Sequence, residues 1–206
     1  MLRGLIHTGD ETAPIGRRVT DVEIAKIRRD GGTQPREGLD ERYVAELVEA
    51  LQDGTRLPPV DLMYDGENYW LYVGFHRLAA HEGAKLTVIA ATVHQGDQVA
   101  AQWESYAANQ SHGLRRSQAD KERAVRAALK HPVGVKMADS LLAKHLGVSD
   151  KTVKKYRELM VLSSEIPKID ERTVERGGVM YSQNTANIGA QRRYESGLPG
   201  LDLPGA

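Results

Sequence analysis

The spacing of hydrophobic positions changes once along this chain, near residue 96, and the change predicts two modules. Before that point, short runs rich in β-branched and aromatic residues alternate with turn signals, as in strands mixed with short helices. After it, apolar residues recur with helical spacing. The pattern therefore predicts an α+β fold, in which an all-helical module follows a small mixed module.

The first module is expected to contain a hairpin and two helices. Residues 60–64 and 68–73 have strand character, and the Asp65-Gly66 dipeptide between them favours a hairpin turn. A helix over 40–53 fits the helical spacing of its apolar residues behind a capping Asp40. The other expected features are a helix end at Gly54, a strand at 22–27, a short helix at 75–81 closed by Gly83, and a strand at 86–93.

The second module is expected to begin with two capped helices. Asp97 can cap a helix over 98–108, and Ser117-x-x-Asp120 resembles a capping box that opens a helix ending near Leu129. The expected division of the chain is a flexible arm at 1–20, the mixed domain at 21–96, a helical region at 97–162 and a tail at 163–206 with a small hairpin around Gly177-Gly178.

Residues 139–158 match the steric pattern of a DNA-binding helix-turn-helix. Ala143 is the small residue needed where the two helices approach each other, and Gly147 suits the turn. Val148 is expected to be buried, as are Val153 and Tyr156 on one face of the second helix. The remaining positions of this recognition helix are polar or basic and are expected to contact DNA: Ser149, Asp150, Lys151, Thr152, Lys154, Lys155 and Arg157.

The amino-acid composition excludes several classes of function. The chain has no cysteine, which excludes a disulfide framework, a thiol nucleophile and a Cys-ligated metal site. No apolar run reaches the ~20 residues that span a bilayer, so we expect no membrane association and a cytoplasmic, nucleoid-associated location. The net charge is zero, but residues 37–67 hold nine acidic side chains and two arginines, whereas 112–157 hold twelve basic and four acidic ones. A basic C-terminal part is consistent with nucleic-acid binding, although a solvated helical surface would have the same charge.

Gly74-Phe75-His76-Arg77 lies where a strand is expected to end and a short helix to begin. Glycine allows backbone N–H groups to approach an anion, and arginine offers a bidentate partner for phosphate. Arg77 could equally pair with an acidic helix residue, and His76 could be a structural histidine.

Three segments in order give this loop a context: Gln34-Pro35-Arg36, Gly74-x-x-Arg77, and the stretch Asn-Gln-Ser-His-Gly-Leu-Arg-Arg from Asn109. The order resembles the N-terminal domain of ParB partition proteins, which shares its fold with sulfiredoxin and precedes a helix-turn-helix. The Gly-Phe-His-Arg loop is closer to that of short ParB-like proteins of bacteria, plasmids and phages. The resemblance spans roughly residues 20–160.

The resemblance implies a pocket for CTP with magnesium. The residues it places there are Gln34, Arg36, Gly74, Phe75, His76, Arg77, Asn109, Arg115 and Arg116. No residue is expected to bind a metal directly or to be catalytic. Phe75 and Ala108 stand where ParB proteins have glutamates, which argues against nucleotide hydrolysis.

The leading expectation is a ParB-like protein that binds double-stranded DNA, as a homodimer, in plasmid or chromosome partition or in transcription regulation. The alternative is a nucleotide-using enzyme on the same module: an NTP hydrolase, a small-molecule kinase or a nuclease. Its carboxylates would come from Asp61, Asp65 and Glu67. A third interpretation keeps the first module only as a protein–protein surface.

Overall fold

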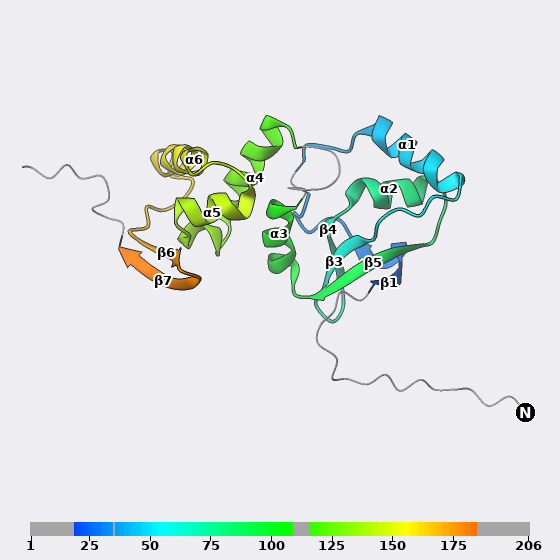
Figure 1. Cartoon of the computed structure of the whole chain (residues 1–206), viewed down its shortest axis with the longest axis horizontal. Helices are drawn as coiled ribbons and strands as arrows, with labels where there is room; N and C mark the ends of the chain where they lie inside the picture. Colours follow the sequence, from blue (N-terminus) through cyan, green and yellow to red (C-terminus); the bar gives the residue numbers. More distant parts are fainter. Residues whose placement is uncertain (1–18, 35, 109–115, 185–206) are drawn as a thin grey trace, which may run out of the picture.

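The computed structural model describes residues 19–34, 36–108 and 116–184, which form the α+β fold that the pattern predicts (Figure 1). The first part is built on a five-stranded mixed sheet of order β1-β5-β3-β4-β2. Its strands are β1 (Val19–Glu23), β2 (Ile27–Arg28), β3 (Val60–Tyr64), β4 (Tyr69–Val73) and β5 (Val88–Gln95). The β3–β4 hairpin turns at Asp65, which accepts hydrogen bonds from the Glu67 and Asn68 amides.

The strand expected at 22–27 is wrong as a single element. A 3-10 turn, η1 (Ile24–Lys26), separates β1 from β2. Because β1 pairs with β5 and β2 pairs with β4, the chain crosses from one edge of the sheet to the other at this turn. The apolar alternation changes phase at this turn, from Val22 and Ile24 to Ala25 and Ile27, but a change of phase does not say which strand each part will pair with.

Two helices, α2 (Phe75–Gly83) and α3 (Gln98–Ala107), cover the sheet, and a third, α1 (Glu41–Gln52), packs on α2. Asp40 caps α1 by accepting from the Arg42 and Tyr43 amides. The first apolar core lies between α2 and the sheet, and α3 packs against β3 and β4. The expected helix end at Gly83 is wrong by two residues, because Gly83 is still helical and Lys85 takes the left-handed conformation, at φ 57°.

The second part is a helical bundle followed by a hairpin. Ser117 and Asp120 form the predicted capping box of α4 (Gln118–Lys130). After a 3-10 turn, η2 (Gly134–Lys136), come α5 (Asp139–Leu146), α6 (Asp150–Leu162) and the hairpin of β6 (Glu171–Arg176) and β7 (Val179–Asn184). Buried residues of α4, α5 and α6 share one core. Within the described ranges, every helix is too short or too polar to span a membrane.

Helix α3 joins the two parts, since it contacts the sheet on one side and α4 and α5 on the other (Figure 1). The Trp103 ring of α3 stacks on the His145 ring of α5, with centroids 4.0 Å apart and planes 6° apart. On its other side Trp103 lies against His131, which follows α4. The bundle is therefore packed directly on the helix that covers the sheet.

Candidate functional site

The α5–α6 pair has the geometry that the helix-turn-helix pattern requires. Gly147 ends α5 in the left-handed conformation, at φ 64°. The Ser149 hydroxyl accepts from the Thr152 amide and caps α6. Ala143 is 4% exposed where the helices meet. Val148 is only partly buried, in contrast to the expectation, because it lies at the margin of the core.

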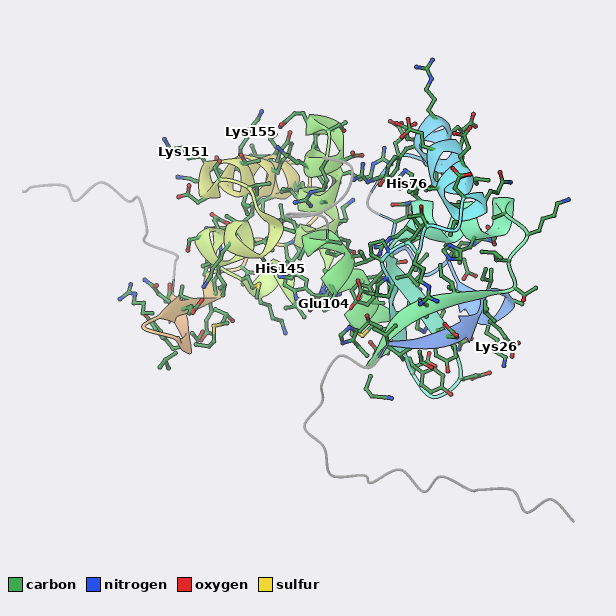
Figure 2. The ribbon with its side chains drawn as sticks, turned by 45° about the vertical axis from the view of Figure 1, so that its right-hand side comes forward. Lys26, His76, Glu104, His145, Lys151 and Lys155 are labelled. Carbon is green, nitrogen blue, oxygen red and sulfur yellow. The ribbon has the colours of Figure 1, made fainter. Side chains whose placement is uncertain are left out.

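Helix α6 has one buried face and one basic, exposed face. Val153, Tyr156 and Met160 pack into the core with α4 and α5. Lys151 and Lys155 point away from the bundle (Figure 2). Lys154 is also exposed, with its ammonium 3.9 Å from Glu158. The fold therefore holds three cations on the outer side of α6.

Arg157 does not belong to this basic face, and its expected DNA contact is corrected. Its side chain is 5% exposed and donates from Nε to Asp139 Oδ1 at 2.7 Å. Its remaining guanidinium nitrogens donate to the carbonyls of Val135 and Met137. Burial lowers the pKa of Arg157, with the Asp139 carboxylate opposing that shift. Helical phase decides this role, because Arg157 lies next to Tyr156 on the inner side of α6.

The second candidate site is a pocket between the two parts, with a volume of about 320 Å³. It is formed by three segments that lie far apart in the sequence: the loop before α1, the start of α2 and the start of α4. The lining residues are Arg36, Glu37, Gly38, Leu39, Asp40, His76, Ser117 and Asp120. Arg36 and His76 belong to two segments of the ParB resemblance, and Ser117 and Asp120 follow the third, residues 109–116.

Arg36 and Asp120 face each other in this pocket. Their side chains are 9% and 11% exposed, with Nη1 and Oδ2 3.8 Å apart. The Gln34 side chain accepts from the Arg36 amide, which shapes the loop before α1. Sequence reasoning identified Ser117 and Asp120 only as a capping box. Their second position, on the wall of the pocket, depends on how α4 packs beside the first module.

His76 connects α2 to the start of α1. Its Nε2 accepts a hydrogen bond from the Asp40 amide at 3.0 Å, so the neutral ring carries its proton on Nδ1. Burial, followed by the positive charge of Arg36, lowers the pKa of His76 below its ordinary value. Figure 2 labels this residue on the side of the first module that faces α4. His76 thus presents an uncharged ring to the pocket.

The other residues of the loop do not line the pocket. Gly74 has φ 104°, and a Cβ atom there would lie 2.7 Å from Val60 Cγ1, so glycine is required on both counts. The Phe75 ring packs against the first core. Arg77 donates to the carbonyl oxygens of Pro58 and Pro59, and its burial lowers its pKa. The sequence allowed an ion pair between Arg77 and an acidic helix residue. In the structure, Arg77 donates its hydrogen bonds to two backbone carbonyls.

Arg116 lies behind the pocket. Its guanidinium donates to the carbonyls of Tyr106 and Leu146, and burial, then the charge of Arg36, lowers its pKa. Asn109 and Arg115, the other expected nucleotide-binding residues of this stretch, lie outside the described residues.

One of the carboxylates considered for an enzyme lies near the loop, since burial lowers the pKa of Arg77 and the charge of Asp61 opposes that shift. Asp61 is beside His94, with 3.9 Å between Oδ1 and Nε2. Asp65 accepts from two amides and from Trp70 Nε1, and these bonds lower its pKa to about 2. Glu67 follows it in the hairpin turn. None of the three lines the pocket. Among the residues described, no group of three or more His, Cys, Asp or Glu side chains has the arrangement of a metal site.

Comparison with protein families finds a match to the first module. Residues 10–109 match the ParB N-terminal domain family. This part of the chain is thus similar to a ParB N-terminal domain. A search of curated proteins found no match to the chain.

Solved structures similar to the chain include ParB proteins and sulfiredoxin. Sulfiredoxin from Arabidopsis thaliana is 24% identical over 38% of this chain and 86% of its own, with a TM-score of 0.35. The C-terminally truncated ParB from Caulobacter crescentus complexed with CTP-gamma-S is 15% identical over 73% and 87% of the two chains, with a TM-score of 0.41. The same protein complexed to the centromeric parS site is 17% identical over 71% and 79%, with a TM-score of 0.47.

Proposed function

We propose that this chain is a ParB-like protein that binds double-stranded DNA through α6 and acts in partition or in transcription regulation. The observation that carries the proposal is the exposed basic face of α6, on a helix that is capped by Ser149 and packed on its other side. The similarity of the first module to a ParB N-terminal domain supports the same function.

The length of each α6 side chain determines whether we expect it to contact base edges or phosphates. Ser149, Asp150 and Thr152 are short polar residues in the first turn, where a helix entering the major groove brings its side chains to base edges. Lys151, Lys154 and Lys155 carry charges on long stems that suit phosphates. The Lys155 ammonium lies 5.5 Å from the centre of the Tyr156 ring, which orients its stem along the helix surface.

A charge reversal on this face tests DNA binding. Lys151→Glu should lower duplex affinity roughly tenfold at low salt and reduce the salt dependence by about one phosphate contact. Fluorescence anisotropy across a salt series measures both quantities. Lys26→Glu is the matched control, because Lys26 is an exposed lysine on the first module, far from α6 (Figure 2). Equal affinities of wild type and Lys151→Glu would contradict the proposed docking.

We also propose that the pocket beside α4 takes a nucleotide of the CTP type with magnesium. Arg36 is the cation on its wall, and Ser117 and His76 offer neutral polar groups. A triphosphate bound to Arg36 would replace the Asp120 carboxylate as its partner. Magnesium would reduce the repulsion between the phosphates and the carboxylates of the pocket, Glu37, Asp40 and Asp120.

Calorimetry with CTP, ATP and ADP, each with magnesium, tests the pocket. CTP should bind to the wild type, and Arg36→Gln should weaken binding roughly tenfold or more because a charge-assisted phosphate contact is lost. Lys130→Gln removes an exposed cation of α4 that pairs with Glu165, outside the pocket lining, and should leave affinity nearly unchanged. If none of the three nucleotides binds, the pocket assignment is wrong and DNA binding by α6 stands by itself.

A further inference from the structure

The first turn of α6 carries a carboxylate among its lysines. Asp150 is the first residue of the helix and is exposed, as are Lys151, Lys154 and Lys155. Asp150 and Lys154 are four residues apart and therefore lie on the same side of α6, next to the lysines that point away from the bundle in Figure 2. A negative charge in this position weakens the attraction of the helix to phosphates, so phosphate binding does not account for Asp150.

The hydrogen bonds of Asp150 leave one of its oxygens open. Oδ1 accepts from the Lys151 amide at 2.8 Å. Over the part of the chain that the structure describes, Oδ2 has no hydrogen-bond donor and the carboxylate forms no ion pair. The other acidic residue of α6, Glu158, by contrast lies 3.9 Å from the Lys154 ammonium. Asp150 therefore presents an acceptor to solvent at the start of the helix.

The neighbouring hydroxyl groups of this turn are bound to each other. The Ser149 hydroxyl accepts from the Thr152 amide at 3.2 Å, and the two hydroxyl oxygens lie 2.8 Å apart. Ser149 thus supplies the cap of α6, and Asp150 is not needed for it. Because this cap fixes the start of the helix, the carboxylate of Asp150 is held at a defined place in the first turn.

We propose that Asp150 selects a cytosine in the major groove, which makes it a specificity-determining residue of α6. This role depends on the proposed docking of α6 on duplex DNA. A carboxylate only accepts hydrogen bonds, and guanine and thymine present acceptor atoms in the major groove. Adenine has its N6 amino group beside the acceptor N7, whereas cytosine presents its N4 amino group without an adjacent acceptor. The best base partner for Oδ2 of Asp150 is therefore cytosine.

Selection from a pool of random duplexes, followed by affinity measurements on the selected sites, tests this role. The wild type should select a cytosine at one fixed position and bind roughly tenfold more weakly when thymine replaces it. Asp150→Ala should lose the preference at that position alone, and should bind unrelated duplexes at least as tightly because a negative charge is gone. Asp150→Asn, which keeps the size of the side chain, should prefer adenine there.

Glu158→Ala is the matched control, because it removes the other exposed carboxylate of α6 and should keep the cytosine preference. If the wild type selects no cytosine, or if Asp150→Ala keeps the wild-type preference at every position, the proposed role of Asp150 is wrong while DNA binding by α6 stands. A lower melting temperature of Asp150→Ala with unchanged base preference also overturns it, by assigning the carboxylate to the helix dipole. A wild type that binds no duplex overturns the proposed function and this role with it.

Discussion

At the scale of single residues, Lys155 and Arg157 differ sharply in exposure. Both are cationic residues of α6, yet Lys155 is exposed and Arg157 is 4% exposed. The guanidinium fork fits its buried position because it can satisfy a carboxylate and two carbonyls at once. Arg157 therefore stabilises the packing of α6 on α5, and the phosphate contacts proposed for α6 rest on the lysines.

Arg157→Ala should destabilise the protein by about 3 kcal/mol, because the change leaves Asp139 and two carbonyls without their main partner. Urea unfolding followed by circular dichroism measures the loss. Lys154→Ala, an exposed position on the same helix, should change stability by less than about 0.5 kcal/mol. If Arg157→Ala keeps wild-type stability but loses DNA affinity as Lys151→Glu does, the structural role is wrong.

At the scale of elements, the starts of α6 and α2 are held in different ways. Ser149 caps α6 with its hydroxyl, whereas Gly74 precedes α2 in a left-handed conformation and has no capping side chain. The α2 start is instead held by its neighbours, since His76 bonds to the Asp40 amide and Arg77 bonds to Pro58. Helix α6 can therefore be recognised from local sequence, but the position of α2 depends on contacts with two other segments.

At the scale of the whole molecule, the pocket and α6 are connected through the helices between them. Asp120 and Ser117 belong both to the pocket and to the first turn of α4, and α4 packs against α6. Arg116 joins the same region to the ends of α3 and α5 through Tyr106 and Leu146. A cation at the C-terminal ends of two helices also interacts favourably with their dipoles.

Arg116→Gln should weaken the junction by about 1–3 kcal/mol, because charged hydrogen bonds to two helix ends are lost. We expect a lower melting temperature than that of the wild type. Trp103, which stacks on His145 at this junction, should become exposed at a lower temperature. Thermal unfolding followed by tryptophan fluorescence and circular dichroism measures both. Arg123→Gln, also an arginine of the α4 region but exposed, is the control. A melting temperature equal to that of the wild type would contradict the bridging role.

The features that can be predicted from the amino-acid sequence alone are local. The caps at Asp40, Asp97, Ser117 and Ser149 and the turn at Gly147 depend on residues within a few positions of one another, and the structure confirms them. Hydrophobic spacing likewise predicted the α+β class and the two helices of residues 139–158.

Contacts between distant segments of the folded chain set which polar groups stay exposed and which strands pair. Arg157 and Arg77 became buried because distant carbonyls and, for Arg157, a distant carboxylate lie within reach. The crossing at residues 24–26 depends on which strands become neighbours. Packing between segments far apart in the sequence determines these features. The spacing of apolar residues predicts which face of an element is buried, but not which other element it packs against.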